Sequence, residues 1–364
     1  MTAPPSSARP AHPPAASDVQ PPDSWHELVR PDRIGPALAA ATGEQAWLTP
    51  DVTLLSGGKS NLTFLVASAA GDLVLRRPPA GPLLPTAHDM AREARVQRAL
   101  AASQVPVPRI VLTDDGELLG VPFYVMERVE GHIIRDELPA GYASTEEERR
   151  RLGLALVDTL ADLHEVVPGE IGLGDYGRPE GFLDRQVRRW TDQWERSADE
   201  EVPAVTELGR LLAARIPASQ RTGIVHGDYR LDNCVVSLSS PPHVNAVLDW
   251  ELSTLGDPLA DLALLLFYWL EPGETGLQLT PAVTDLAGFP TRAEVTARYA
   301  SRSGADVSDL AFHEGLAHFK CAVITQGIAM RARSGAMAGQ EFGDLSQEVR
   351  RIAERGLERF GSRS

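Results

Sequence analysis

The sequence predicts an α+β fold of two lobes, in which a small strand-rich lobe precedes a larger helical lobe. Its 364 residues exceed the length of one ordinary domain. Between residues 46 and 128, short apolar runs alternate with turn-like residues, as they do in strands. Beyond Gly131 the apolar residues follow helical spacing instead. We place the lobes at residues 24–128 and 129–364, and we expect ligands to bind in a cleft between them.

The strand-rich lobe is preceded by residues 1–23, which are rich in Pro, Ala and Ser and have almost no large apolar side chains. Such a segment buries too little surface to offset the entropy of ordering, so we predict a disordered tail. Within the lobe, periodicity favours a short helix over residues 33–41 and a longer one over 86–101 with Thr86 as its N-cap. Five predicted strands cover residues 46–55, 61–68, 72–77, 108–113 and 121–128.

The helical lobe shows apolar residues at helical spacing over long stretches. The predicted helices cover residues 145–166, 182–196, 205–216, 259–269, 293–303, 307–334 and 345–360. A hairpin over residues 224–249 lies between them in the sequence and carries the most informative motif of the chain.

Composition excludes several classes of function. The net charge of −15 argues against nucleic acid as a partner, because binding to a phosphate backbone needs a basic surface. No apolar run approaches eighteen residues, so we expect no membrane span. Cys234 and Cys321 are too few for a disulfide framework, and no secretory signal is present, which together indicate a cytoplasmic protein. Neither zinc-ligand spacing nor a Gly-x-Ser-x-Gly elbow occurs.

The hairpin contains the run His-Gly-Asp-Tyr-Arg-Leu-Asp-Asn, which ends at Asn233, and sixteen residues later comes Asp249 in Val-Leu-Asp-Trp-Glu. Phosphoryl transfer needs a carboxylate beside the attacking hydroxyl and oxygen ligands that hold Mg²⁺ against nucleotide phosphates. Asp228 precedes Asn233 by five residues, which is the offset between base and metal ligand in a kinase catalytic loop. Asp249 follows an apolar run and is predicted to lie at a strand end. We therefore predict Asp228 as the catalytic base and Asn233 and Asp249 as Mg²⁺ ligands.

The chain resembles the aminoglycoside-phosphotransferase-like (kinase-like) superfamily over about residues 45–335, because Gly227 follows the His of the catalytic loop. More narrowly, the stretches 74–79, 83–89 and 92–93 resemble the phosphotransferase domain that is linked, by fusion or gene neighbourhood, to acyl-CoA dehydrogenases. The resemblance implies a protein-kinase-like fold with ATP and Mg²⁺ as cofactors. It also implies a functional link to an acyl-CoA dehydrogenase.

Nucleotide contacts are predicted first in the turn after the first strand, where Ser56, Gly57, Gly58, Lys59 and Ser60 follow one another. Glycines there let backbone amides approach phosphate oxygens. Lys59 and Ser60 are the side chains best able to touch a phosphate. The spacing is not that of a P-loop, and a plain hairpin turn is the alternative.

On the third strand, Val74 and Arg76 share one face, because strand side chains alternate. Kinases use this pair of positions to cover the nucleobase and to bind the α- and β-phosphates, the latter with a Lys. An Arg at this position can still hold phosphate. Glu93 could orient Arg76 through an ion pair, or it could instead pair with Gln97 on the helix surface. The backbone from about Glu127 to Val129 is predicted to bind the adenine edge.

Several neighbouring residues are predicted to support the site rather than react. We interpret His226 as structural, Asp232 as solvent-facing or a loop brace, Asp257 as a helix N-cap and Asp261 as a brace of the catalytic loop. Aromatic residues at helical spacing are interpreted as helix core, although any could line an acceptor pocket: Trp190, Trp194, Phe267, Tyr268 and Trp269.

The sequence thus predicts a small-molecule phosphotransferase that moves the γ-phosphate of ATP to an acceptor hydroxyl. The narrower resemblance implies a hydroxyacyl-CoA or a related hydroxy acid as acceptor. Arg185, Arg188 and Arg189 could then meet the negative charges of CoA, although a solvated charged face is an equal alternative. Other hypotheses are an aminoglycoside phosphotransferase and a catalytically inactive nucleotide-binding regulator, which Arg76 in place of Lys keeps open.

Overall fold

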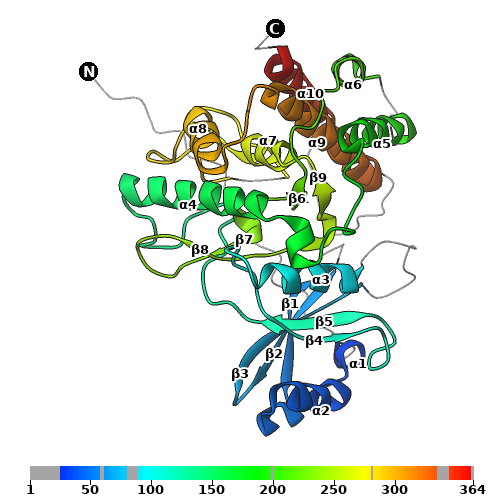
Figure 1. Ribbon diagram of the computed structural model, residues 1–364, viewed down its shortest axis with the longest axis vertical. Helices are drawn as coiled ribbons and strands as arrows, with labels where there is room; N and C mark the ends of the chain where they lie inside the picture. Colours follow the sequence, from blue (N-terminus) through cyan, green and yellow to red (C-terminus); the bar gives the residue numbers. More distant parts are fainter. Residues whose placement is uncertain are drawn as a thin grey trace, which may run out of the picture.

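The structure, a computed structural model, describes residues 25–57, 61–79, 89–197, 201–279, 282–333 and 344–361. Figure 1 shows a strand-rich lobe at one end and a larger helical lobe at the other, which confirms the predicted two-lobed α+β class. The predicted disordered tail lies outside the described residues, as do Gly58, Lys59 and Ser60. The predicted N-cap Thr86 is wrong, because the helix begins at Met90 and its N-cap is Asp89, whose side chain accepts from the backbone N–H of Arg92.

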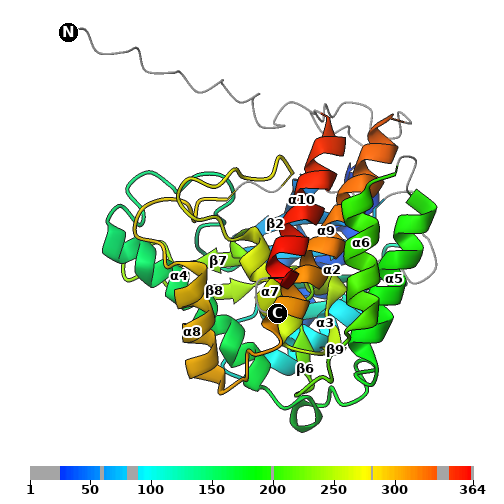
Figure 2. The same ribbon diagram turned by 90° about the horizontal axis from the view of Figure 1, so that it is seen from above.

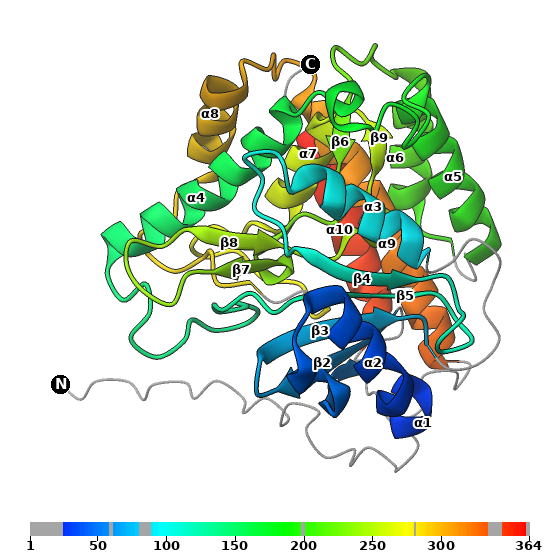
Figure 3. The same ribbon diagram turned by 60° about the horizontal axis from the view of Figure 1, so that its bottom comes forward.

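The strand-rich lobe is built on one antiparallel sheet in the order β1-β2-β3-β5-β4. Its strands are β1 (Asp51–Gly57), β2 (Leu62–Ser68), β3 (Gly71–Arg77), β4 (Ile110–Asp114) and β5 (Phe123–Glu127). One face packs on α1 (Trp25–Val29) and α2 (Pro31–Thr42) through Phe64 and Leu75. The other face packs on α3 (Met90–Leu100) through Val74 and Tyr124. Figure 3 shows α1 and α2 on one side of the sheet and α3 on the other. Because strand side chains alternate, neighbouring residues of β3 pack on these opposite faces.

The first predicted strand is wrong over its first part. Residues Gln45–Leu48 form a short 3₁₀ helix (η1), and β1 begins only at Asp51. The helical turn lets Trp47 fill the core under α2, where it is buried. Gly35 of α2 makes this close approach possible, because a Cβ there would lie 2.6 Å from the Leu48 carbonyl oxygen. Tertiary packing therefore overrides the strand pattern of this stretch.

The helical lobe is arranged around α9 (Leu310–Arg333), which contacts helices from several parts of the chain (Figure 2). α10 (Leu345–Gly361), α5 (Phe182–Ser197), α6 (Pro203–Ala214) and α7 (Leu259–Tyr268) pack against it. α4 (Glu146–Glu165) and α8 (Arg292–Ser303) pack on each other beside this group. Thr145 and Thr291 begin these two helices with complete capping boxes. In the part of the chain that is described, no helix has the length and apolar character to cross a membrane.

The predicted hairpin over residues 224–249 is in fact divided between two small sheets. β7 (Cys234–Val236) pairs with β8 (Val244–Val247) as a hairpin, whereas β6 (Gly223–Val225) pairs with β9 (Thr254–Gly256) from beyond the predicted range. The loops between these strands contain two 3₁₀ turns, η3 (Leu231–Asn233) and η4 (Trp250–Leu252). This arrangement brings the loop after β6 and the residues after β8 to one side of the helical lobe, next to the sheet. A further 3₁₀ turn, η2 (Pro168–Ile171), follows α4.

Candidate active site

The loop after β6 is held by Asp261, a fully buried residue in the first turn of α7. Its carboxylate accepts hydrogen bonds from the backbone N–H groups of His226 (2.6 Å) and Gly227 (2.8 Å). Burial alone would raise the pKa of Asp261, but the hydrogen bond and charge of His164, together with these neighbours, hold it below its ordinary value. The predicted role of Asp261 as a brace of this loop agrees with the geometry.

Gly227 explains why the loop needs glycine after the His. Its φ is 85°, in the left-handed region, and a Cβ would lie 2.8 Å from the carbonyl oxygen of Leu252. Any side chain at this position would push η4 away from the loop. Because Gly227 has no side chain, the catalytic loop with Asp228 can lie close to the residues after β8.

His226 is buried, and both of its ring nitrogens have partners. Nε2 lies 2.8 Å from the carbonyl oxygen of Leu248, and Nδ1 accepts from the backbone N–H of Asp228 at 3.2 Å. The ring also packs on Trp250, with 4.7 Å between ring centroids. His226 thus connects the catalytic loop to the segment that carries Asp249, in agreement with its predicted structural role.

The Asp228 carboxylate is half-buried, with the guanidinium of Arg230 at 3.7 Å and two neutral donors nearer to it. Asn233 Nδ2 donates to the backbone oxygen of Asp228 at 2.8 Å and to Oδ2 at 3.0 Å, and the Tyr268 hydroxyl donates to Oδ1 at 3.3 Å. Because the NH₂ group of Asn233 faces Asp228, its Oδ1 points away from that carboxylate and is left to accept other partners. The five-residue offset in the sequence therefore becomes a direct contact.

Asp249 follows β8 in an unusual backbone conformation, with φ 65° and ψ 62°. Such a conformation costs free energy for a residue other than Gly, and it occurs mainly where function requires it. It directs the carboxylate out of the helical lobe toward the sheet, where Arg76 Nη2 of β3 forms an ion pair with Oδ1.

Arg76 is largely buried and joins three carboxylates. Besides Asp249, its guanidinium lies 3.2 Å from Glu93 of α3 and 3.6 Å from Glu251 of η4. Burial raises the pKa of Glu93 to about 7, although the charge of Arg76 opposes this shift. The predicted ion pair of Glu93 with Arg76 is present, whereas the Gln97 side chain donates to the backbone oxygen of Glu93 and to the Tyr124 hydroxyl, not to the Glu93 carboxylate.

Two residues of this cluster were missed by the sequence analysis, Asn61 and Glu251. The Asn61 amide donates to Glu93 at 3.3 Å and to Glu251 at 3.0 Å, and so joins the two lobes. The available signals were the position of Asn61 directly after the glycine turn and that of Glu251 two residues after Asp249. Neither signal indicates a partner without the fold.

A cavity of about 620 Å³ lies between the lobes, a size typical of small-molecule sites. Six of the predicted site residues line it: Val74, Arg76, Glu127, Val129, Asn233 and Asp249. Glu93 lies behind Arg76, and Asp228 contacts Asn233 from outside the lining. Ser56 and Gly57 belong to the end of β1, and the rest of the predicted turn lies outside the described residues.

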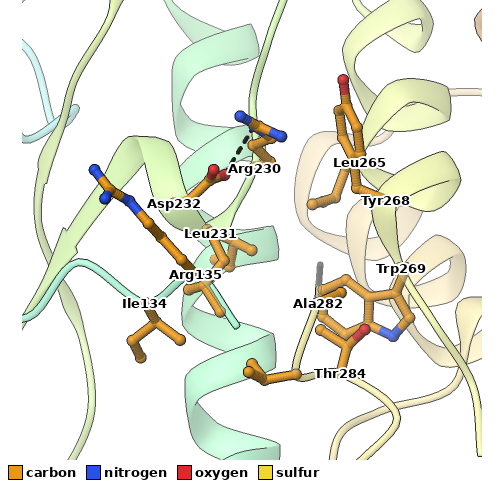
Figure 4. A pocket seen from close by; sticks show the side chains of 12 residues that line it. Ile134, Arg135, Arg230, Leu231, Asp232, Leu265, Tyr268, Trp269, Ala282 and Thr284 are labelled. Carbon is orange, nitrogen blue, oxygen red and sulfur yellow. Dashed lines mark ion pairs between the residues drawn. The ribbon is translucent and has the colours of Figure 1, made fainter. Parts of the chain in front are cut away.

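Next to this cavity is a smaller one of about 30 Å³, shown in Figure 4, which shares Arg135 and Asp232 with it. Arg230 forms an ion pair with Asp232 at 2.8 Å, and its guanidinium lies 4.9 Å from the ring centroid of Tyr268. Of the two roles predicted for Asp232, the geometry thus favours the loop brace. Asp257 accepts from the backbone N–H of Leu259 at 3.0 Å, but the N-cap of α7 is Pro258, so the predicted N-cap is wrong by one residue.

The match to a family of known chemistry covers the same part of the chain. Residues 51–295 match the model of the phosphotransferase enzyme family. The chain belongs to this family. The phosphotransferase is 38% identical to acyl-CoA dehydrogenase family member 11 of Rattus norvegicus over 312 residues, which cover 84% of the chain and 40% of that protein. It therefore spans about two fifths of the length of this relative.

Solved structures agree with the family assignment. A candidate aminoglycoside phosphotransferase from Ralstonia eutropha JMP134 superposes on this phosphotransferase with a TM-score of 0.74 and 34% identity, over 86% of this chain and 93% of that one. A mutant of the aminoglycoside phosphotransferase APH(4)-Ia, in a complex with ADP and hygromycin B, has a TM-score of 0.58 over 90% and 99% of the two chains. At 15% identity, this second likeness concerns the fold alone, which is the predicted kinase-like fold.

Proposed function

We propose that this phosphotransferase moves the γ-phosphoryl group of ATP to a hydroxyl of a small-molecule acceptor. One observation carries the proposal: Asp228, Asn233 and Asp249 converge beside an interlobe cavity whose opposite wall holds Arg76. A carboxylate, an amide oxygen, a second carboxylate and a cation are the groups that in-line phosphoryl transfer requires.

In the proposed reaction the acceptor hydroxyl oxygen forms a bond to the γ-phosphorus. The bond between that phosphorus and the oxygen bridging to the β-phosphate breaks, and ADP leaves with the bonding electron pair. The hydroxyl proton passes to Asp228, whose carboxylate is oriented by Asn233 and Tyr268. Positioning and electrostatic stabilisation supply most of the rate acceleration in such reactions.

The interlobe cavity is the proposed ATP site. Val74 would cover the adenine, and the backbone from Glu127 to Val129 would bind its edge, since all three positions line the cavity. Arg76 would bind the phosphates and Glu93 would orient it. Ser56 and Gly57 at the end of β1, with Gly58, Lys59 and Ser60 after them, remain the proposed backbone and side-chain contacts of the phosphate chain.

Mg²⁺ fits the donors that are present. Asn233 and Asp249 would hold the ion, which takes oxygen ligands and is usually bound by one or two protein groups together with water and phosphate oxygens. Bound there, Mg²⁺ would neutralise charge that develops on the phosphates. Asp249 is paired with Arg76 in this structure, so metal binding has to compete with that ion pair.

For the acceptor we propose a hydroxyacyl-CoA or a related hydroxy acid. Support comes from the likeness to acyl-CoA dehydrogenase family members and from chemistry. A hydroxyl is a poor leaving group, and its phosphorylation would prepare the acyl chain for elimination. An aminoglycoside is the second candidate, because the structure that is 34% identical over most of both chains comes from a candidate aminoglycoside phosphotransferase.

The test is to incubate the protein and Mg-ATP with 3- and 4-hydroxyacyl-CoAs, the free hydroxy acids and kanamycin-type aminoglycosides, and to detect phosphorylated product by mass. Phosphorylated thioester or acid supports the proposal in full. If the aminoglycosides are phosphorylated and the thioesters are not, the proposed acceptor is wrong and the proposed reaction type stands. Binding of ATP without turnover on any acceptor would instead indicate the inactive regulator.

A further inference from the structure

A second sizeable cavity, of about 210 Å³, is lined in part by the catalytic loop and shares no lining residue with the interlobe cavity. Its walls come from α5, α7 and α9, and the loop itself contributes Gly227, the residue before Asp228. Most of the lining is apolar, including Phe182, Trp190, Leu264 and Leu316. For a ligand with an apolar body, transfer from water into this cavity would therefore cost little free energy.

Two cations line this cavity, Arg189 of α5 and Lys320 of α9. Lys320 Nζ donates a hydrogen bond to the carbonyl oxygen of Gly227 at 2.8 Å and lies 6.0 Å from the ring centroid of Trp190. The ammonium thus stands between the apolar walls and the residue that precedes the proposed base. Since an ammonium has three N–H donors, this bond leaves further donors for a ligand.

The identity of Lys320 is itself unusual for this chain. Of its 35 Lys and Arg residues, only Lys59 and Lys320 are lysines. Arginine is thus the general choice for a positive charge here, yet the position against the catalytic loop carries the other cation. A compact point charge on a flexible stem fits a narrow place beside a backbone carbonyl, where a planar guanidinium would need more room.

The acidic and titratable groups that line the cavity do not offset these cations. Asp261 is fully buried and committed to the backbone N–H groups of the loop and to His164. His313 lies 3.0 Å from the Asp309 carbonyl oxygen and 3.3 Å from Asp257. The charge presented to a ligand therefore comes from Arg189 and Lys320.

The three arginines at helical spacing on α5 differ in their surroundings. Arg185 donates to backbone oxygens of the preceding loop, and Arg188 pairs with Asp184 on the same helix. Arg189 lines the cavity, and its guanidinium lies 5.1 Å from the ring centroid of Trp190. Only one of the three is therefore placed to meet a ligand in the cavity, and Arg188 offers a matched control.

We propose that this cavity binds the acceptor, and that Lys320 and Arg189 select one with an apolar chain and a negative charge close to the hydroxyl. This inference rests on the proposed function and gives its acceptor a chemical class. A polycationic sugar would place its ammonium groups against these two cations, which disfavours binding. A hydroxy acid or hydroxyacyl thioester would instead place its chain on the apolar walls and its charge near Lys320 and Arg189.

Direct binding tests the cavity without turnover. Titration calorimetry without nucleotide compares 3-hydroxyhexanoate, 3-hydroxyhexanoyl-CoA, the neutral 1,3-hexanediol and kanamycin. We expect the two anionic ligands to bind at least about tenfold more tightly than the diol, as for a charge-assisted hydrogen bond. Equal affinity for acid and diol, or tighter binding of kanamycin, overturns the inference.

The variants Lys320→Met and Arg189→Gln should each weaken binding of the acids by about tenfold and leave binding of the diol unchanged. Lys320→Arg should retain part of the affinity, and Arg188→Gln should retain all of it. Melting temperatures establish that each variant is folded, and Arg189→Gln on the exposed face of α5 decides the matter if Lys320→Met does not fold. A loss shared by Arg188→Gln, or no loss in Arg189→Gln, contradicts the assignment.

Adding Mg-ATP to the same panel separates this inference from the proposed function. Selective binding of the acids without any phosphorylated product leaves the cavity assignment intact and removes the proposed reaction. If the acid is phosphorylated and its KM is unchanged in Lys320→Met and Arg189→Gln, the proposed reaction stands and the assignment of the cavity as the acceptor site is wrong.

Discussion

Two charged clusters hold the catalytic loop and the segment that carries Asp249. The first, which we call the loop cluster, consists of Asp261, His164 and the backbone N–H groups of His226 and Gly227. All of its members belong to the helical lobe. The carboxylate has a hydrogen-bond partner on each side, and its pKa is lowered accordingly. Such a fully satisfied network is rigid, and it fixes the position of Asp228.

The second cluster, the Arg76 cluster, consists of Arg76, Glu93, Asp249 and Glu251. It joins the two lobes, and one guanidinium faces three carboxylates, so negative charge is in excess. The raised pKa of Glu93 reflects its burial within this arrangement. A cluster of this kind is prepared to accept further positive charge, whereas the loop cluster is complete. We therefore expect the first cluster to act as scaffold and the second to rearrange when metal and nucleotide bind.

The largest expected effect comes from Asp228→Ala, which removes the group that the loop cluster positions. General-base catalysis typically contributes ~10²–10⁴-fold, so we expect turnover to fall by about that factor while ATP binding persists. Single-turnover rates and ATP affinity measured on the same samples check this. Retention of more than about a tenth of the wild-type rate would contradict the assignment of the base.

Asp261→Ala tests the loop cluster as scaffold. It leaves two backbone N–H groups without a partner inside the protein, and we expect the free energy of unfolding to fall by about 3 kcal/mol. Denaturant unfolding measures the change, and Thr291→Ala at the start of α8 is a comparison that removes only a capping box, with an expected loss of about 1 kcal/mol. Equal losses in the two variants would show that Asp261 is only another cap.

Asp249→Asn tests the Arg76 cluster at its proposed metal ligand. The change removes one negative charge from the ion's coordination, so we expect half-maximal activity to require about tenfold more Mg²⁺. Asp232→Asn is the matched control, because Asp232 lines the same cavity but pairs with Arg230. If both variants gave the same Mg²⁺ titration curve, Asp249 would not be the ligand.

The proposed catalytic residues were predictable from the sequence, whereas the contacts that build the two clusters were only partly so. Asp228, Asn233 and Asp249 lie within one short stretch, so their spacing carries the geometry directly. Asn61 and Glu251 meet across the lobes through packing of segments that are 190 residues apart, and no local pattern records that contact. The 3₁₀ turn around Trp47 was missed for the same reason, because burial under α2 overrides the strand pattern.

The residues of the proposed acceptor cavity were likewise only partly predictable from the sequence. Its two cations lie on different helices, α5 and α9, and the sequence offered three arginines of α5 at equivalent spacing. Only the fold distinguishes Arg189 from Arg188, which pairs with Asp184 on the same helix. Lys320 carried a compositional signal as one of two lysines, but its place against Gly227 depends on how α9 crosses the catalytic loop.

The last expected effect concerns pH and the buried Glu93 of the Arg76 cluster. Burial raises the pKa of Glu93 from 4.5 to about 7, so the folded protein keeps this proton at pH values where the unfolded chain has lost it. Between about pH 5 and pH 7 the folded state therefore binds more protons, and its stability falls as the pH rises through that window. Groups with lowered pKa, such as Asp261, act in the opposite direction but below this range.

Glu93→Gln isolates this contribution, because Gln keeps polar contacts to Asn61 and Tyr124 but has no proton to lose in this range. We expect the difference in unfolding free energy between variant and wild type to change by about 2 kcal/mol between pH 5 and pH 8, in favour of the variant at the higher pH. Denaturant unfolding at several pH values measures it. Parallel stability curves would mean that Arg76 keeps Glu93 ionised throughout, and the Arg76 cluster would then be balanced like the loop cluster rather than ready to rearrange.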